Sequence, residues 1–598
     1  MQKASLPRNG GVYEFISKQS NDPIMERRTC AVSSKPFAIF QSDKDFLKKI
    51  SPTFPLSEGE GSGVRKYPLP LPTLCPEERQ RRRLSRRNER KLYRRKCDAT
   101  GKQIISMYSP DKPYKVYNQD ARFSDSWDAK DYGMEIDFSK SMREQFSQLL
   151  LAVPKRGLSM GRWSENCDYV NGVGMSKNCY LIFGASFDEE CYYGSGINNC
   201  KHCVDNTWIK DSEILYGCSD CTNCYKSFYL QDCLNCKDSS YLINCKNCDR
   251  CYGCVNLENQ HYHIFNTPYH DKEAYEQALL TISPDVRVQE MKKLIKKYPV
   301  QNCTCINVEW GIGDKIFNSK DIFYGFDIKN AEHIKYANGT SNSRDCMDVS
   351  WVDGYVTDGC TKIYEAGYIF EQSFDVAFSS ICRNNCHNIY YCIECCRKVE
   401  NCFLCCGLKG WSYCILNKQY TPEEYNALVP QIIKKMQADS ERGENFPISM
   451  STFAYNESVV QERLPLTREE ALARGYKRQD NNYDPTISSW TTTLMGDQIP
   501  SDITAVTDNI LNAILICEVS KRPFRIIKQE LDFYRKYNLP LPRKHPDVRH
   551  LERLTQRPWR ELHLRACDKC GVEMLSIYPP HFDRKVYCES CYNKEMYW

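Results

Sequence analysis

The sequence DCTNCYKSFYLQ DCLNCKDSSYLI NCKNCDRCYGCV, residues 220–255, consists of three consecutive twelve-residue units that begin at Asp220, Asp232 and Asn244. A short, regular period rich in Cys, Asn, Asp, Ser and Tyr, without helical apolar spacing, predicts a parallel β-helix whose turns stack equivalent side chains. Two units would form one coil of about 24 residues. A compact twelve-residue turn is the alternative, because periodicity alone does not choose between them. Looser copies of the unit place further cysteines at the same interval, namely Cys167, Cys179, Cys191 and Cys203.

The array is itself duplicated. The segment CVNLENQHYHIFNTPYHDKEAY from Cys254 parallels CCGLKGWSYCILNKQYTPEEY from Cys405, which predicts two tandem β-helical blocks over residues 160–300 and 301–440. Each block should end in a helix that covers its last rung, since open β edges invite aggregation. In the second block, Thr421, Pro422 and Glu424 supply the N-cap, first-turn proline and capping-box acid of that helix. Residues 441–512 are expected to form a connecting arm.

The two ends of the chain are copies of each other. CAVSSKPFAIFQSDKDFLKKI from Cys30 matches CEVSKRPFRIIKQELDFYRKY from Cys517, and a second motif that starts at Cys97 matches one that starts at Cys567. We therefore expect related small modules at residues 1–135 and 513–598, each made of two parts.

The strongest motif lies in the last of these parts. Cys567, Cys570, Cys588 and Cys591 form two Cys-x2-Cys pairs separated by seventeen residues, the spacing of a tetrahedral four-thiolate zinc site. Four thiolates close the coordination sphere, so the predicted Zn²⁺ is structural and not catalytic. In the N-terminal copy only Cys97 remains of the quartet, so that copy should fold without metal.

The composition of the chain limits the roles that the other cysteines can have. The chain has 598 residues and 35 cysteines, and neither a signal-peptide core at its start nor an apolar stretch long enough to span a membrane. We expect a cytoplasmic protein without a membrane segment, and a reducing cytosol disfavours disulfides. Three explanations stay open for the array: buried thiols, an iron–sulfur cluster at residues 245–254 whose spacing departs from the ferredoxin pattern, and additional zinc. The candidate ligands for that zinc are Cys221, Cys224, Cys233, Cys236, Cys245 and Cys248.

The charge is unevenly distributed. The net charge is only +5, yet residues 79–96 carry eleven basic residues against one acid, Glu89. Arginine-rich segments beside small modules favour phosphate contacts, and the C-terminal copy repeats the feature more thinly. The predicted nucleic-acid-binding residues are Arg79, Arg81, Arg82, Arg83, Arg86, Arg87, Arg90, Lys91, Arg94, Arg95, Lys96, Arg549, Arg553 and Arg557.

The order of these parts resembles a group of Cys-rich proteins from the ultrasmall candidate-phyla bacteria, which share the signatures EVSKRPFRIIKQELDFYRK, LPLPRKHPDVRH and KVYCESCY. The end modules resemble bacterial treble-clef or zinc-ribbon domains. The resemblance implies an architecture and a compartment, and it brings no activity with it.

The sequence thus predicts a mainly β, zinc-binding scaffold without catalysis that binds RNA or a ribonucleoprotein. DNA is the alternative nucleic acid, since no groove-reading element separates the two. A scaffold for an acidic protein partner also fits. A β-helical carbohydrate-active enzyme is the alternative class, although Asp220 and Asp232 recur before cysteines as turn-forming residues do. The sequence does not indicate an oligomeric state.

Overall fold

The structure is a computed structural model of the whole chain. It describes residues 10–55, 63–161, 163–332, 338–341, 347, 349, 352–353, 364–365, 367, 369–370, 373–481, 492–557 and 560–596.

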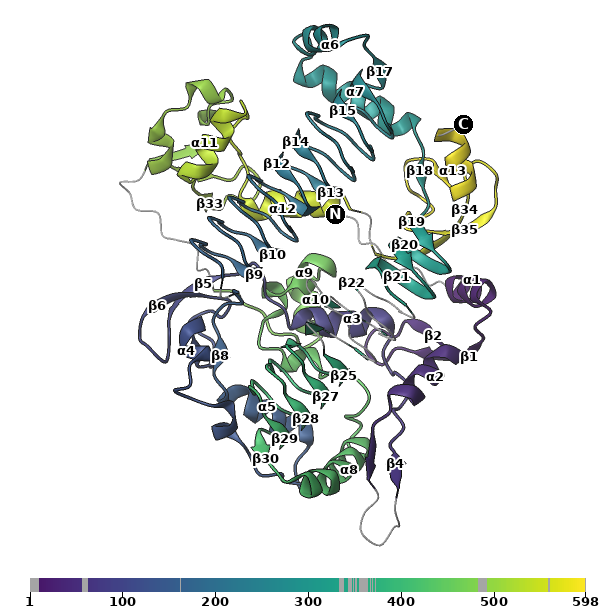
Figure 1. Cartoon of the computed structure of the whole chain (residues 1–598), viewed down its shortest axis with the longest axis vertical. Helices are drawn as coiled ribbons and strands as arrows, with labels where there is room; N and C mark the ends of the chain where they lie inside the picture. Colours follow the sequence, from purple (N-terminus) through teal and green to yellow (C-terminus); the bar gives the residue numbers. More distant parts are fainter. Residues whose placement is uncertain are drawn as a thin grey trace.

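Two β-solenoids make up the central part of the molecule (Figure 1). The predicted parallel β-helix is therefore confirmed. Each coil of the first solenoid is twelve residues long, because Tyr180 pairs in parallel with Tyr192, Tyr192 with Val204, and Val204 with Tyr216. The coil of 24 residues is therefore wrong, and the compact turn is the one that forms. The strands of this solenoid are β9 (Asn171–Gly174), β10 (Phe183–Ser186), β11 (Thr207–Lys210), β12 (Glu213–Tyr216), β13 (Ser219–Thr222), β14 (Tyr225–Phe228), β15 (Asp249–Tyr252) and β16 (His261–Ile264).

A second period, of three residues, closes each coil. In residues 230–257, every third residue from Leu230 to Leu257 points inward, and the residue before each inward position from Cys233 to Cys254 has a positive φ near 50–65°. Such left-handed residues turn the chain by a corner, so four corners complete a twelve-residue square. Asn, Asp and Gly tolerate this conformation best. Asp220 and Asp232 have φ of 54° and 56°, which confirms that they are turn residues.

The narrow interior of the solenoid explains why cysteine is frequent at the inward positions. Cys233 Sγ donates to the carbonyl oxygens of Gln231 at 3.3 Å and Leu242 at 3.7 Å, and the same pattern recurs along the solenoid. Ser239 takes an equivalent place, with Oγ 2.8 Å from the carbonyl oxygen of Lys237. A small side chain with a weak donor fits where four side chains share the centre of one coil. All cysteines in the described residues are free thiols.

The second solenoid follows the same design with an extra residue in some coils. His387 pairs with Glu400 across thirteen residues, and Glu400 pairs with Ser412 across twelve. The longer coils contain two consecutive left-handed residues, such as Asn384 and Asn385. Its strands include β19 (Cys305–Val308), β20 (Gly311–Ser319), β21 (Ile322–Lys329), β22 (Asn338–Ser341), β25 (Phe374–Ala377), β27 (His387–Tyr390), β28 (Glu400–Phe403) and β29 (Ser412–Ile415).

Helices follow the last coils, as predicted. After β16 come α6 (Lys272–Leu279) and α7 (Pro284–Lys297), and Tyr275 of α6 packs against Tyr262 with ring centroids 6.0 Å apart. After β29 comes α8 (Pro422–Ala438), whose Thr421 and Glu424 form the predicted capping box. Tyr425 of α8 lies 5.7 Å from Tyr413, so this helix covers the final rung.

The end modules have matching elements. The N-terminal module contains α1 (Gly10–Ser20), β1 (Ile24–Thr29), β2 (Pro36–Phe40), α2 (Gln41–Ile50), α3 (Pro76–Ser85), β5 (Tyr93–Lys96), β6 (Gln103–Ser106), β7 (Val116–Tyr117) and α4 (Gln119–Phe123). The C-terminal module contains β32 (Ile514–Ile516), β33 (Pro523–Phe524), α11 (Lys528–Lys536), α12 (Pro546–Thr555), β34 (His563–Ala566), β35 (Glu573–Ser576), β36 (Val586–Tyr587) and α13 (Glu589–Met596).

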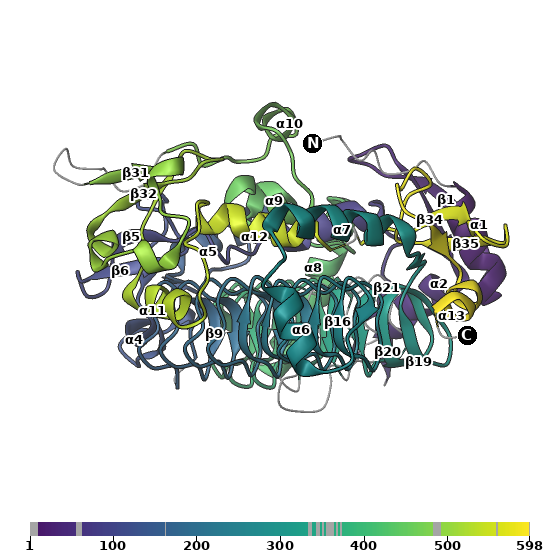
Figure 2. The ribbon, with the colours of Figure 1, turned by 90° about the horizontal axis from the view of Figure 1, so that it is seen from above.

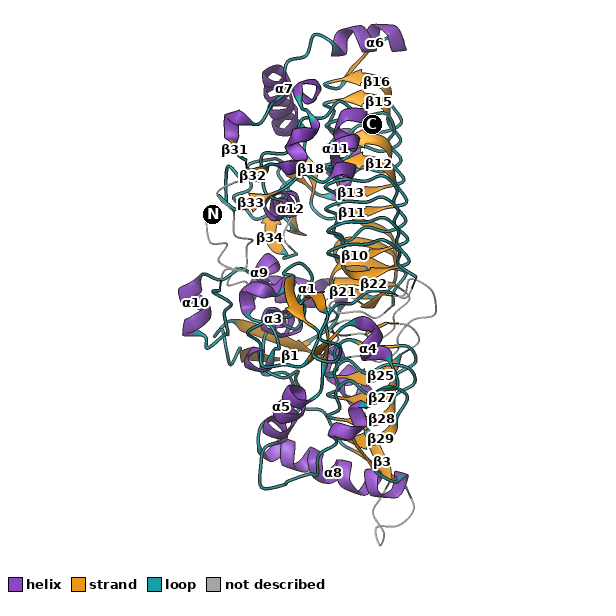
Figure 3. Ribbon diagram, turned by 90° about the vertical axis from the view of Figure 1, so that its left-hand side faces the viewer, coloured by secondary structure: helices purple, strands orange, loops and turns teal. Residues whose placement is uncertain are grey.

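The modules and solenoids form two layers. Figure 2 shows the coils on one side and the terminal modules with α7, α12 and α9 (Val459–Arg463) on the other, and Figure 3 shows the same separation from the side. Residues predicted as a connecting arm also enter this second layer, since Phe446, Tyr455 and Val460 are buried. None of the helices in the described part of the chain is both long and apolar enough to cross a bilayer.

Candidate metal centre and basic surfaces

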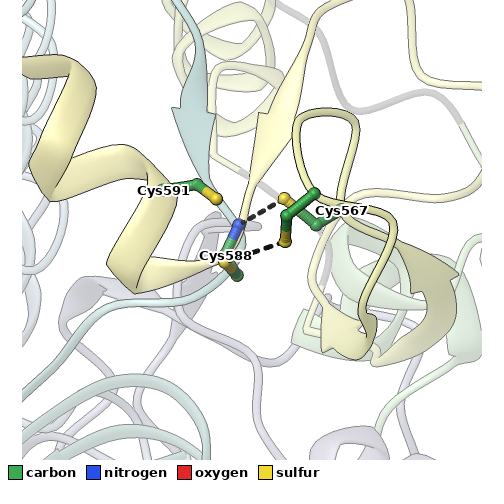
Figure 4. A group of neighbouring side chains, drawn as sticks. Cys567, Cys588 and Cys591 are labelled. Atoms are coloured by element: carbon green, nitrogen blue, oxygen red, sulfur yellow. Dashed lines mark hydrogen bonds between the residues drawn. The ribbon is translucent and has the colours of Figure 1, made fainter.

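Four thiols converge at the C-terminal end of the molecule, and Figure 4 labels three of them, Cys567, Cys588 and Cys591. The Sγ atoms of Cys567, Cys570, Cys588 and Cys591 all lie within 4.8 Å of one another. Cys570 Sγ is 3.8 Å from Cys588 Sγ, and four thiolates at about 2.3 Å from a tetrahedral ion are separated by about 3.8 Å. The donor set and its spacing therefore fit a metal ion, and the prediction that these four cysteines form a group able to hold one is confirmed.

Local backbone geometry positions these thiols. Cys567 begins a tight turn in which its N–H donates to Val572 O at 2.8 Å and Gly571 N–H donates to Cys567 O at 2.9 Å. Gly571 has φ of 75°, a conformation that a glycine adopts without strain. Burial would raise the pKa of Cys567, but hydrogen bonds from the N–H groups of Cys588, Cys570 and Lys569 lower it to about 6. A lowered thiol pKa favours the thiolate that metals bind.

The N-terminal copy has the same turn without the ligands. Cys97 N–H donates to Lys102 O at 2.8 Å, and Gly101 N–H donates to Cys97 O at 2.8 Å. Asn118 stands where Cys588 stands in the other copy, and its side chain caps α4 by accepting from Ala121 N–H at 3.1 Å. This copy therefore uses a helix cap where the C-terminal copy has a thiol.

In the described residues of the first part of each end module, only two possible metal ligands lie close together. Cys30 lies near Cys75, and Cys517 lies near His545, whose Nδ1 accepts from Asp547 N–H at 3.1 Å and caps α12. Among the described residues, the C-terminal quartet is the one group of three or more Cys, His, Asp or Glu side chains that could hold a metal ion.

The array cysteines lie inside the coils. Cys221, Cys233 and Cys245 stack on one inner side, and Cys224, Cys236 and Cys248 stack on the next. Their Cys-x2-Cys spacing equals the three-residue side of the coil, and their thiols donate to carbonyl oxygens. The geometry favours buried thiols over additional metal.

Replacing Cys233 and Cys236 by serine tests this interpretation. Serine already occupies equivalent inward positions with the same hydrogen bond to a carbonyl oxygen. We expect the double variant to stay folded and to keep the metal content of the parent protein, measured by elemental analysis as ions per chain. A loss of one ion per chain in the variant would instead place metal inside the solenoid.

The basic run is built into the interior. Arg79, Arg81, Arg83, Arg86, Arg87 and Arg95 are each at most 8% exposed. Arg81 donates to Glu77 at 2.9 Å and Glu78 at 3.3 Å, and to the carbonyl oxygen of Leu464 at 3.0 Å. Arg82 pairs with Glu444, and Arg90 and Lys91 pair with Asp547. Within this run only Arg94 and Lys96 are exposed. The buried members hold distant segments together and offer no outer surface to a nucleic acid.

The predicted C-terminal arginines are buried as well. Arg549 and Arg553, both in α12, pair with Asp205, whose side chain is 3% exposed. Arg557 donates to Asp220 at 2.6 Å in the first solenoid and to Asp327 at 2.8 Å in the second. Lys315 of the second solenoid also reaches the first, 3.2 Å from Asp220 and from Asp232. These charges connect the two solenoids, and they occupy the carboxylates that a glycosidase would need free.

A basic surface that the sequence predictions missed lies on α7. Its last seven residues, 291–297, hold four lysines and no acid, and all four are exposed: Lys292, Lys293, Lys296 and Lys297. Lys293 pairs with Glu290 at 2.6 Å, whereas the other three have no ion pair among the described residues. Four lysines within seven residues were the available signal. The sequence analysis predicts only a capping role for this helix.

This helix ends beside the metal centre. α7 leads into β18 (Val300–Gln301), which pairs in parallel with β36 of the C-terminal module. Val300 N–H donates to Lys585 O at 2.9 Å, and Arg584 donates to Tyr298 O at 3.4 Å. Arg584 and exposed Lys585 thus extend the basic surface of α7 toward the four thiols.

Comparison with known proteins gives no family. No family model and no curated protein match the sequence. A solved structure named as an acetyltransferase from Desulfovibrio desulfuricans G20 aligns at 9% identity over 38% of this chain, with a TM-score of 0.09. The alignment spans 63% of that protein, and a similarity this low supports no conclusion about the fold or activity of the present chain.

Proposed function

We propose that this protein is a non-catalytic scaffold with a structural Zn²⁺ in its C-terminal module, and that it binds RNA or a ribonucleoprotein. Zinc is proposed because four thiolates are the ligand set of closed structural zinc sites. The module core around these cysteines is small, with Met574, Val586 and Tyr592 among its buried residues, so metal binding would supply much of its folding free energy.

The exposed lysines of α7 carry the RNA-binding proposal. Lys292 and Lys296 are four residues apart, as are Lys293 and Lys297, so the two pairs lie on one side of the helix. A row of exposed ammonium groups, three of them without an ion pair among the described residues, suits successive phosphates of a nucleic-acid backbone, which bind through charge and release counterions. The basic surface is defined here as these four lysines with Arg584 and Lys585.

RNA is proposed in preference to DNA because the surface lies beside a small metal module, and the described residues contain no helix-turn-helix or similar groove-reading motif. The outer faces of the first solenoid are less suitable, since basic and acidic side chains alternate there and several are paired, such as Lys201 with Glu189 and Arg250 with Asp249. Nothing in the described ion pairs favours the alternative of a carbohydrate-active enzyme.

Neutralising the four lysines tests this proposal. We expect the variant with Lys292, Lys293, Lys296 and Lys297 changed to glutamine to bind single-stranded RNA more weakly. The slope of log affinity against log salt should become shallower by about three, since each phosphate contact to a single strand contributes about 0.7. The measurement is fluorescence anisotropy of labelled RNA across salt concentrations.

The matched control removes four charges elsewhere. Lysines on the outer side of the first solenoid are changed to glutamine in one variant: Lys177, Lys201, Lys226 and Lys237. RNA affinity and salt slope should stay near those of the parent protein in this control. Equal losses in both variants would show that net charge alone governs binding, and no RNA binding by the parent protein would refute the proposal.

A further inference from the structure

A cavity lies where the N-terminal module meets both solenoids. It has a volume of about 70 Å³. Its wall includes Asn171 and Gly172 from the first solenoid, Arg383 and Glu394 from the second, and Arg156 of β8 (Lys155–Arg156), the strand that pairs with β7. The loop after α3 closes another side. The cavity therefore exists only in the assembled molecule and belongs to neither solenoid alone.

Basic residues outnumber acidic ones among the residues that line this cavity, beside apolar ones such as Leu150 and Phe453. Five lining residues are basic, and only Glu89 and Glu394 are acidic, which leaves an excess of three positive charges. Glu89 is already paired with Arg87. Buried charges without compensation are costly, so a fold that gathers several cations around one cavity favours an anion inside it. The five basic residues are Arg86, Arg87, Lys155, Arg156 and Arg383.

Among these basic residues, Arg156 most clearly lacks a partner for its charge. Its residue is 6% exposed, and among the described residues its guanidinium makes no hydrogen bond and no ion pair. Burial, with Arg383 nearby, lowers the pKa of Arg156 to about 10. Among the described residues, the side chain of Arg383 makes a cation–π contact with Phe123, at 5.8 Å to the ring centroid, and no hydrogen bond or ion pair. Buried Arg156 and half-buried Arg383 thus line the same cavity without a hydrogen-bond acceptor among the described residues, and Glu394 is the acid that acts on Arg156.

Arg86 adds to the same environment from the basic run. It is 7% exposed and donates one hydrogen bond, to Phe446 O at 2.9 Å, while its Nε has no partner. Glu365 is the acid that stabilises the charge of Arg86, and its carboxylate also accepts a hydrogen bond from Asn445 N–H at 2.8 Å. Lys155 lies 3.5 Å from Cys406 Sγ and has no carboxylate partner among the described residues.

From this geometry we propose that the cavity is a binding site for a small oxyanion of the phosphate class, held by Arg156, Arg383 and Arg86. A volume of about 70 Å³ accommodates roughly five water molecules, and phosphate has five non-hydrogen atoms. Guanidinium groups match the planar pairs of oxygens that phosphate presents. The cavity is too small for a nucleotide, so this site is separate from the proposed RNA surface on α7.

Titration calorimetry on the full chain tests the site, with protein dialysed into Tris chloride. Sodium phosphate and glycerol phosphate are the two probes, and sodium chloride at equal ionic strength is the blank. We expect one binding event per chain with either probe, and tighter binding of glycerol phosphate would identify a phosphomonoester as the ligand. Phosphate retained through purification would be released by acid and measured with molybdate at about one per chain.

Three variants decide the outcome. Arg156→Gln and Arg383→Gln should each weaken phosphate binding roughly ten- to hundredfold, as expected when one charge-assisted hydrogen bond is removed. Lys398→Gln, which removes an exposed charge from the second solenoid, should bind as the parent does. Partly exposed Arg383 keeps the test valid if Arg156→Gln fails to fold. The proposal is overturned if neither probe binds and no phosphate is retained, or if all three variants bind equally.

Discussion

Removal of the proposed Zn²⁺ should unfold the second part of the C-terminal module, residues 563–596, while both solenoids remain folded. Structural Zn²⁺ contributes about 10–16 kcal/mol of apparent binding free energy in small zinc modules, far more than the few buried residues beside Cys567 can supply. Chelation, or the substitution Cys588→Ser, should therefore abolish protection of backbone amides in residues 563–596. Hydrogen exchange with mass spectrometry measures this directly, and a colorimetric chelator counts the ions released.

The N-terminal copy supplies the control for the zinc prediction. Cys97 occupies the position of Cys567, but its partner is Asn118 and not a second thiol. Cys97→Ser should leave amide protection in both modules near the level of the parent protein. If the chelator left residues 563–596 as protected as before, the folding of this module would not depend on metal.

Loss of the charge on Asp205 should destabilise the contact between α12 and the first solenoid. The carboxylate accepts from Arg553 Nη1 at 3.1 Å and from Arg549 Nη1, and all three side chains are at most 9% exposed. Asp205→Asn keeps a residue that tolerates the left-handed conformation, but it leaves two buried guanidinium groups uncompensated. We expect a cost of about 3–5 kcal/mol, seen as a lower thermal midpoint and faster amide exchange in α12.

Asp211→Asn is the matched control for this second prediction. Asp211 is also left-handed, with φ of 49°, but it is exposed and accepts a hydrogen bond from Asn199. Surface substitutions of this kind change stability by about 0.5 kcal/mol or less. Similar losses in the two variants would mean that the carboxylate of Asp205 adds nothing beyond its effect on the corner of the coil.

The fold could be predicted as far as local patterns determine it. The twelve-residue period specifies a parallel β-helix, and Thr421 with Glu424 locates the start of α8. The coil length could not be predicted, because the three-residue period that closes a coil also produces Cys-x2-Cys pairs. Cys221 and Cys224 therefore resemble a zinc knuckle in sequence, although in the structure they are neighbouring inward side chains on adjacent sides of one coil.

The metal site could be predicted from the sequence and the basic surface could not, and sequence separation is again the reason. The four C-terminal thiols lie within 25 residues of sequence, so their spacing was sufficient to predict the site. The partners of the basic run come from distant segments: Leu464 lies 383 residues after Arg81, and Asp547 lies 457 residues after Arg90. No local pattern indicates that such charges will be paired inside the protein. Charge density alone therefore predicted an interface where the structure has an interior.

The twelve-residue coil also has a consequence for how this protein can change in length. Because every coil pairs with its neighbours in the same register, adding or deleting one whole unit preserves each inward ladder and shifts the ends by one strand spacing, about 4.8 Å. A single inserted residue is accommodated differently, as the two consecutive left-handed residues at Asn384 and Asn385 show. Duplication of one unit beyond Asp232 would therefore lengthen the first solenoid while leaving the ion pairs of Asp205 and Asp220 with α12 and Arg557 in place.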